Sequence, residues 1–223
     1  MRGWFVTGTG TEVGKTVVAA AIANVRRRRG DAVAVFKPAE SGLTEIAGSG
    51  AEADHELLRR AAGSAQSDDE IAPYRYGPPV SPHLGAELAG ERIDPGLLVE
   101  RAAAAAASAD VLVCEGVGGF LVPLTPDFLV RDLARELGLA VVIAAAAGLG
   151  TVNHSMLTIE AVRAAGLEAS GVVLTPWPGS PGDVERSNRE AIERLGAVRV
   201  GTLPELDLAD AGSWPRGGFP GGD

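Results

Sequence analysis

The most informative feature of this sequence is a glycine-bearing loop near its start, GTGTEVGKT from Gly8 to Thr16. An apolar run at 4–6 precedes the loop, and a helical pattern at 17–29 follows it. Strand, glycine loop, Gly-Lys-Thr and helix in this order are typical of a phosphate-binding site. Glycines let backbone N–H groups approach phosphate oxygens, and the start of the helix adds unpaired donors and a positive dipole end. The segment therefore predicts a nucleoside triphosphate site rather than a simple turn before a helix.

The end of this loop has an assignable chemistry. Lys15 is expected to reach the terminal phosphates, and the Thr16 hydroxyl is expected to join the ligand shell of a Mg²⁺ ion. The common spacing would place the first glycine at Thr9, whereas the glycines stand at 8 and 10. If Gly8 opens the loop, it is one residue longer than usual.

Length and composition indicate one globular domain. The chain has 223 residues, of which 46% are hydrophobic and 22% charged, enough for one substantial core. We expect a single domain over residues 1–210. The segment 211–223 is rich in Gly and Pro and is expected to be a poorly ordered tail.

Charge and apolar patterning exclude several classes of partner. The net charge of −9 argues against nonspecific binding to nucleic acid. The basic run Arg26–Arg29 stands just before a glycine, where cations suit the end of a helix. No unbroken apolar run has membrane-spanning length, so no membrane partner is expected. The single Cys114 excludes an internal disulfide and fits a cytoplasmic setting.

Apolar runs alternate with helical patterns along the whole chain. The runs are short and mostly β-branched, as in strands that are buried on both faces of a parallel sheet. The predicted strands are 4–7, 32–36, 111–114, 140–145, 171–174 and 198–202. The predicted helices are 15–29, 53–62, 95–107, 128–137, 152–165 and 183–195, with Asp94-Pro95 and Ser180-Pro181 as helix starts. The pattern predicts an α/β fold with a doubly wound, mostly parallel sheet in three α/β/α layers, like that of P-loop NTPases.

Ligands gather at the carboxyl ends of the strands in such a sheet. Lys37 follows the second predicted strand, where a cation suits an anionic intermediate, although a lone loop lysine is often idle. Glu115 follows the third strand, the usual place for a carboxylate that attends Mg²⁺, although it could simply end the strand. Asp54 is either a helix cap or part of the site. Cys114 is expected to be a core thiol, and His55 and His83 to be structural or incidental, so no metal other than Mg²⁺ is expected.

Several segments, taken together, are specific to one family. They are FVTGTGTEVGKT (5–16), KPAESG (37–42), Asp54, SPH (81–83), EGVGG (115–119), GLGTVNHSMLT (148–158) and LPEL (203–206). The set, including the long phosphate loop, resembles the dethiobiotin synthetase family over about residues 4–206. The resemblance implies that 7,8-diaminopelargonic acid, CO₂ or bicarbonate and ATP are converted to dethiobiotin, ADP and phosphate. It further implies a carbamate and a carbamic-phosphoric anhydride as intermediates.

The resemblance also implies roles for individual residues. Lys37, Lys15 and Thr11 would act in catalysis, and Thr11 and Ser41 would contact the diamine end of the substrate. Thr16, Asp54 and Glu115 would attend Mg²⁺. A second copy in a homodimer would receive the distal carboxylate of the substrate on Gly150, Thr151, Val152 and Asn153. The nucleotide would be held by Glu12, Val13, Gly14, Lys15, Thr16, Val17, Asp54, Glu115, Gly116, Val117, Gly118, Thr175, Pro176, Pro204, Glu205 and Leu206.

One position departs from the family pattern, and one other class of protein competes. The family often has an Asn near Thr175 to read adenine, so we expect weak discrimination among nucleoside triphosphates. The competing class is the ATPase switch of the chromosome-partitioning kind. Those proteins have an extra lysine early in the loop, where residues 9–13 of this chain have none.

Overall fold

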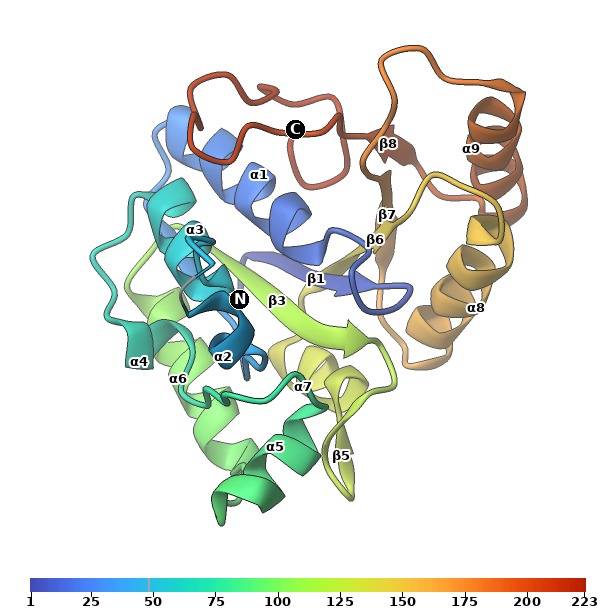
Figure 1. The fold of residues 1–223 in the computed structure, drawn as a ribbon. Helices are drawn as coiled ribbons and strands as arrows, with labels where there is room; N and C mark the ends of the chain where they lie inside the picture. The colour runs from blue at the N-terminus through green and yellow to red at the C-terminus, as the bar shows by residue number, and fades with distance from the viewer. Residues whose placement is uncertain (48) are drawn as a thin grey trace.

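The computed structural model describes residues 1–47 and 49–223, and a six-stranded parallel sheet lies at its centre (Figure 1). The strand order is β2-β3-β1-β6-β7-β8. The strands are β1 (Gly3–Gly8), β2 (Val33–Phe36), β3 (Val111–Gly119), β6 (Ala140–Ala145), β7 (Ala169–Leu174) and β8 (Val200–Thr202). All six predicted strands are thus confirmed, and β1, which leads into the phosphate loop, lies between β3 and β6.

Helices cover both faces of the sheet and complete the three predicted layers (Figure 1). One face is packed by α1 (Lys15–Arg28) and α3 (Asp54–Ala62). The opposite face is packed by α6 (Pro95–Ala107), α7 (Val130–Leu137), α8 (Thr151–Ala164) and α9 (Asp183–Gly196). Because side chains alternate along a strand, Phe5 joins the core of the second face and Val6 joins that of the first.

The third strand is longer than predicted. The sequence placed its end at Cys114 and a glycine-rich loop after it, but β3 continues to Gly119. The continuation is stabilised by pairing with β1, in which Val6 lies opposite Glu115 and Gly8 lies opposite Gly119. The parallel partner therefore extends the strand through residues whose own preference is for a turn.

Several short elements were missed. They are α2 (Leu43–Ile46), α4 (Asp68–Ile71), α5 (Pro82–Ala89) and a hairpin of β4 (Pro123–Thr125) and β5 (Phe128–Leu129). The helix predicted from residue 128 begins at Val130, because residues 128–129 pair with β4 instead.

The two predicted helix starts had different outcomes. Asp94 does cap α6, and its carboxylate accepts from the N–H groups of Gly96 and Leu97. The Ser180-Pro181 start is wrong, because α9 has Gly182 as its capping residue. There the Glu185 carboxylate accepts from the Gly182 N–H group at 2.7 Å and removes the need for Ser180.

The segment 211–223, predicted to be poorly ordered, lies folded beside α1 (Figure 1, red). Trp214 and Phe219 are buried in the same core as α1, and this aromatic area explains the difference from the prediction. Arg28 donates to the carbonyl oxygens of Gly212 and Trp214, so the basic run stabilises the segment as well as ending a helix. A Cβ at Gly201 would lie 2.6 Å from the Phe219 Cβ, and glycine there lets the segment approach β8.

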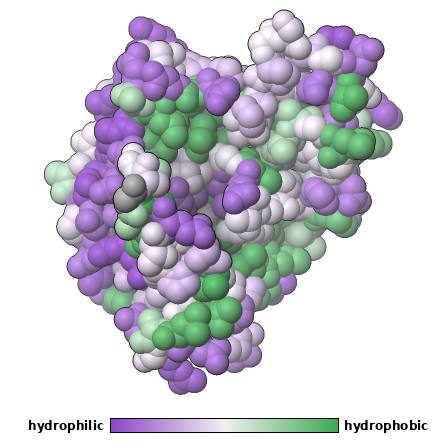
Figure 2. Space-filling view, viewed as in Figure 1, coloured by the Kyte–Doolittle hydropathy of each residue, from purple (hydrophilic) through white to green (hydrophobic). Residues whose placement is uncertain are grey.

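The helices of the described ranges are all too short or too polar to cross a membrane. The face seen in Figure 2 is largely hydrophilic, with its apolar side chains in separate patches. Cys114 is buried as predicted, and burial raises the pKa of its thiol.

Candidate active site

The phosphate loop connects β1 to α1 in the way the sequence predicted. Gly14 takes the capping position of α1 with φ of 82°, a left-handed conformation that favours glycine. A Cβ at this position would also lie 2.5 Å from the Thr175 Cγ2 atom. Lys15 is buried, and its ammonium donates to the carbonyl oxygen of Gly10 at 2.8 Å. The lysine therefore lies folded over the loop in which the phosphates would bind.

Four predicted site residues from separate elements meet in one ionic cluster. Lys37, after β2, lies with its Nζ atom 2.7 Å from Glu115 Oε1 and 2.8 Å from Asp54 Oδ2. The Thr16 hydroxyl donates to the same Glu115 oxygen at 2.9 Å. Lys37 is 3% exposed and Glu115 is fully buried, so bulk water screens this cluster weakly. Lys37 is thus paired with both carboxylates, and Asp54 contacts this cluster as well as standing at the start of α3.

Burial and charge shift the pKa values within this cluster. Burial alone would lower the pKa of Lys37, but the carboxylates of Glu115 and Asp54 raise it on balance. Burial raises the pKa of Glu115, and the charge of Asp54 adds to that effect. Burial of Lys15, together with the nearby Lys37, lowers its pKa. Lys37 in turn lowers the pKa of Asp54 against the effect of burial, so Lys37 and Asp54 each favour the charged form of the other.

The cluster fits a hard divalent cation. Glu115 Oε2 is buried and has no hydrogen-bond donor within the described residues, whereas Oε1 accepts from both Thr16 and Lys37. An orphaned carboxylate oxygen beside a hydroxyl and a second carboxylate is the oxygen-rich donor set that Mg²⁺ prefers. Thr16, Asp54 and Glu115 are therefore the residues that could hold Mg²⁺.

A cleft of about 430 Å³ lies over this cluster. Most of the predicted site residues line it: Thr11, Glu12, Gly14, Lys15, Thr16, Val17, Lys37, Ser41, Asp54, Glu115, Val117 and Gly118. The structure therefore brings the phosphate loop, the two lysines and both carboxylates to one opening at the carboxyl ends of the strands.

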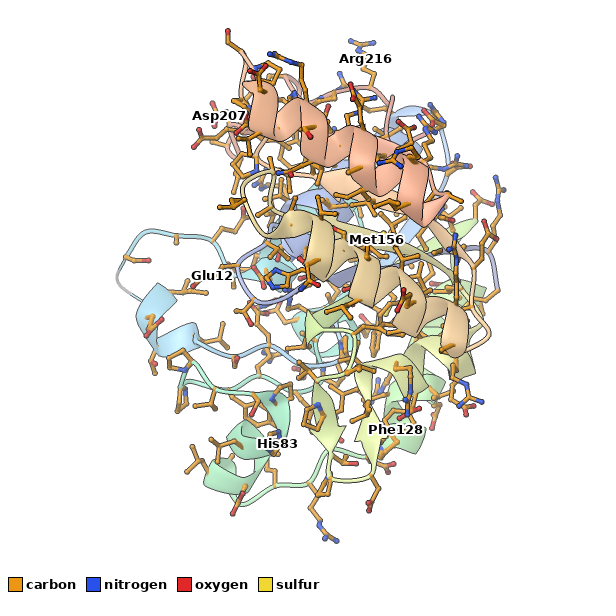
Figure 3. The ribbon with its side chains drawn as sticks, turned by 90° about the vertical axis from the view of Figure 1, so that its right-hand side faces the viewer. Glu12, His83, Phe128, Met156, Asp207 and Arg216 are labelled. Carbon is orange, nitrogen blue, oxygen red and sulfur yellow. The ribbon has the colours of Figure 1, made fainter. Side chains whose placement is uncertain are left out.

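The segments that follow β7 and β8, which are predicted to lie around the base, contact each other beside the phosphate loop. Thr175 is buried with its methyl group against Gly14. Pro176 follows it, and the Trp177 N–H group donates to the Leu203 carbonyl oxygen at 2.7 Å. This bond joins the segment after β7 to residues 204–206, in which Pro204 and Glu205 are exposed and Leu206 is partly buried. In Figure 3, Glu12 in the phosphate loop lies between Asp207 of this region and His83 on α5.

Two further predicted nucleotide residues, Val13 and Gly116, lie outside the lining of the cleft, as do Thr175, Pro176 and residues 204–206. A Cβ at Gly116 would meet Val130 and Phe5, so this glycine faces the core on the α7 side of the sheet. Val13 is partly buried against the α1 core, and a Cβ at Gly8 would lie 2.7 Å from its side chain. The backbone of both residues stays available, but their side-chain positions serve packing.

The residues predicted to take the distal carboxylate, 150–153, do not line the cleft of their own chain. They begin α8, where Gly150 is the capping residue with φ of 92°. Asn188 on α9 donates to the carbonyl oxygens of Ala147 and Gly148 and fixes the preceding loop. Leu149, in that loop, is 95% exposed.

Sequence reasoning missed several residues of the cleft, which are Glu40, Glu52, Leu57 and Leu208. Glu40 is buried and bonds to His55, whose Nδ1 atom lies 2.6 Å from Glu40 Oε2. The prediction that His55 is structural agrees with this contact. No spacing rule pairs two residues from different loops, so the sequence offered no signal for it.

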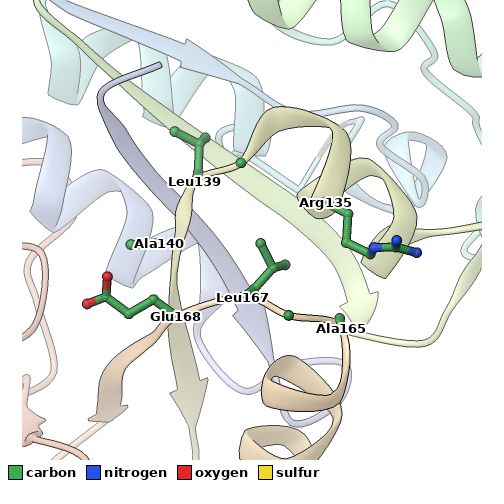
Figure 4. A pocket seen from close by; sticks show the side chains of 8 residues that line it. Arg135, Leu139, Ala140, Ala165, Leu167 and Glu168 are labelled. Atoms are coloured by element: carbon green, nitrogen blue, oxygen red, sulfur yellow. The ribbon is translucent and has the colours of Figure 1, made fainter.

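A second hollow lies at the opposite edge of the sheet, where β6 begins (Figure 4). It is lined by Arg135, Leu139, Ala140, Ala165, Leu167 and Glu168 together with Gly138 and Gly166. None of the predicted site residues is among them.

Fold and site together define an α/β nucleotide-binding protein of the P-loop class. A family model described as an AAA domain matches residues 2–213. ATP-dependent dethiobiotin synthetase BioD of Anaeromyxobacter sp. (strain Fw109-5) is 41% identical over 209 residues, covering 89% of this chain and 92% of the relative. The enzyme of the same name from Rhodococcus erythropolis (strain PR4 / NBRC 100887) is 41% identical over 215 residues, covering 94% and 88%. The chain belongs to the dethiobiotin synthetase family, and the resemblance found in the sequence is confirmed.

Solved structures with much lower identity show the same fold. The septum site-determining protein MinD from Pyrococcus horikoshii, complexed with Mg-ADP, superimposes with a TM-score of 0.56 at 15% identity, covering 92% of this chain and 82% of that one. Apo McdA from Cyanthece gives a TM-score of 0.54 at 15% identity, covering 93% and 87%. These neighbours support the fold alone.

Proposed function

We propose that this enzyme uses ATP and Mg²⁺ to carboxylate 7,8-diaminopelargonic acid and close a cyclic urea, giving dethiobiotin, ADP and phosphate. The observation that supports this best is the buried Lys37 beside the phosphate loop, in one cleft with Thr11 and Ser41. In the competing ATPase switches the extra lysine stands in the phosphate loop, whereas Lys37 comes from the loop that follows β2. Family membership supports the same reaction.

The chemistry would proceed in three steps. One amine nitrogen adds to the carbon of CO₂ and loses a proton, which gives a carbamate. A carbamate oxygen attacks the γ-phosphorus of ATP, and ADP leaves. The second amine attacks the carbamoyl carbon and loses a proton, and phosphate leaves as the ring closes.

The residues of the chain would mainly position charge during these steps. Lys15 and Lys37 would face the transferring phosphoryl group from two sides, and Lys37 would hold the carbamate. Thr11 and Ser41 would orient the diamine end. Thr16, Asp54 and Glu115 would hold Mg²⁺, which would supply charge neutralisation to the phosphates. Thr175, Pro176 and residues 204–206 would surround the base.

The proposal extends to a homodimer. Residues 150–153 lie outside their own cleft, and the exposed Leu149 and Leu157 next to them offer apolar area for a second copy. Backbone N–H groups at the start of α8 would then take the distal carboxylate of the partner's substrate. The cytoplasmic setting stays a prediction from the single cysteine.

A phosphate-release assay tests the reaction. ATP is supplied with Mg²⁺, alone or with the diamine, bicarbonate or both. We expect fast release only when both are present. Equal release in all four mixtures would contradict the proposal and would indicate an ATPase switch of the partitioning kind.

A further inference from the structure

Helix α3 has half of a capping box at its start, in which the Glu56 carboxylate accepts from the Ala53 N–H group at 3.1 Å. Its capping residue is Ala53, which has no side-chain oxygen to accept from the free N–H groups of the first turn. Glu40, from the loop that follows β2, supplies that acceptor instead. Its Oε1 atom accepts from the Asp54 N–H group at 2.7 Å, and its Oε2 atom lies 3.4 Å from the His55 backbone nitrogen. A carboxylate at this end of a helix also suits the helix dipole.

Glu40 is fixed in place from several directions. It is 2% exposed, and its Oε2 atom lies 2.6 Å from His55 Nδ1. Its backbone N–H group donates to Tyr74 O at 2.9 Å, and its carbonyl oxygen accepts from the Tyr76 N–H group at 2.8 Å. The carboxylate therefore cannot shift without moving the main chain on either side of it.

Two residues of the loop that follows β2 bind Asp54, one at its backbone and one at its side chain. Glu40 binds the backbone of Asp54, and Lys37, three residues earlier in the loop, binds its carboxylate at 2.8 Å. The positions of Lys37 and Asp54 relative to each other are thus set by one short segment, although the two residues belong to different elements.

We propose that Glu40 is a positioning residue, which caps α3 from the Lys37 loop and thereby holds Asp54 in place to receive a divalent cation. The inference rests on the proposed function, because it takes Asp54 as a metal ligand. Stability alone would not require this arrangement, since Ser in place of Ala53 could cap the helix locally at no cost of a buried carboxylate. A remote cap adds a fixed tie between the helix and the loop. Residues that orient metal ligands typically change metal affinity about 10–100-fold when they are replaced.

The test measures Mn²⁺ binding to the enzyme–ADP complex by the loss of the free Mn²⁺ signal in electron paramagnetic resonance, corrected for Mn²⁺–ADP alone. We expect Glu40→Ala to weaken Mn²⁺ binding about tenfold or more, and Glu40→Gln, which keeps one acceptor oxygen, to weaken it less. Asp94→Ala is the matched control, because Asp94 caps α6 with bonds of 2.8 and 3.4 Å and is not among the residues that line the cleft. It should lower thermal stability and leave Mn²⁺ affinity unchanged.

The double variant Glu40→Ala with Ala53→Ser separates positioning from stability. The new Ser should restore the melting temperature and slow amide exchange at the start of α3, because the helix regains a cap. Mn²⁺ affinity should stay weak, because the tie to the Lys37 loop is still missing. Recovery of full affinity in the double variant, or wild-type affinity in Glu40→Ala, would overturn the proposal.

The variant Asp54→Asn shows whether a negative result contradicts the role of Glu40 or the proposed metal site itself. If Asp54→Asn binds Mn²⁺ as tightly as the wild type, Asp54 is no metal ligand and the assignment of the metal site is wrong. If Asp54→Asn binds weakly while Glu40→Ala binds normally, the metal site stands and only the role of Glu40 is wrong.

Discussion

Lys37 is the residue on which most of the site depends. Its ammonium lies between Asp54 and Glu115, the two carboxylates that would attend Mg²⁺, and is almost fully buried. It belongs to a different loop from the phosphate cradle, so it can act on the reaction without holding the nucleotide. Two lysines in one buried cluster are suited to an intermediate that bears several negative charges.

Replacing Lys37 with Gln should abolish dethiobiotin formation and change ATP affinity by less than about tenfold, roughly 1.4 kcal/mol. The variant also leaves the buried Glu115 without its cation, which typically costs about 3–5 kcal/mol of stability. Turnover and ATP binding are therefore measured at a temperature where circular dichroism shows a folded protein. Wild-type turnover in the folded variant would contradict the assignment of Lys37 to catalysis.

Thr175 should make the enzyme tolerant of the nucleotide base. Reading adenine needs a donor and an acceptor held together, and the Thr175 methyl group instead faces Gly14. A bidentate base contact is worth about 1–3 kcal/mol in nucleic-acid readers, so losing it should cost roughly one to two powers of ten in the preference for ATP. The measurement compares kcat/KM for ATP, GTP, CTP and UTP. A preference for ATP above about a thousandfold would show that another group reads adenine.

The contact between His55 on α3 and Glu40 should make the free energy of unfolding depend on pH. The hydrogen bond from His55 to Glu40 raises the pKa of His55 above its ordinary value near 6.5. A group whose pKa is raised in the folded state adds stability below its unfolded pKa and loses that contribution as pH rises through its folded pKa. The wild type should therefore have a higher free energy of unfolding than His55→Gln, and the difference should be largest at about pH 5–6. It should shrink above about pH 6.5. A difference that grows with pH would contradict this.

The regular elements were predictable, and the connections between them were not. The continuous apolar runs at 140–145 and 171–174 correctly predicted β6 and β7, because a strand buried on both faces of a parallel sheet needs such a run. The four-residue helices α2 and α4 show no full period in the sequence, and tertiary contacts define them. Lys37 and Glu115 could be predicted as site residues because each follows a predicted strand. The contact of Glu40 with α3 could not be predicted, because it joins two segments that are brought together only by the whole fold.

At the scale of the molecule, the segment 211–223 is expected to contribute to stability. Phe219 is fully buried in the core of α1, so Phe219→Ala should cost about 3–5 kcal/mol, the usual range for a core aromatic. Urea unfolding measures this difference. The exposed Leu88 on α5 provides the control, since Leu88→Ala removes no core contact. Equal stability of both variants would show that the segment does not pack in solution.

The shared site of the proposed homodimer can be tested by mixing inactive variants. Lys37→Gln damages the reacting end, and Asn153→Asp should damage the end supplied by the partner, because the new carboxylate would repel the distal carboxylate of the substrate. After unfolding and refolding together in equal amounts, half of the dimers are mixed and each has one intact site, so activity should return to about a quarter of wild type. No recovery, with dimers present in sedimentation, would contradict a site shared between copies.

The most direct test of the proposed reaction follows the carbon atom that it adds. The enzyme is incubated with ATP, Mg²⁺, the diamine and ¹³C-bicarbonate, and dethiobiotin and ADP are quantified by mass spectrometry and chromatography. The proposed function predicts dethiobiotin labelled at the ureido carbon, with one ADP formed for each molecule of product. ADP formed without labelled dethiobiotin would contradict it.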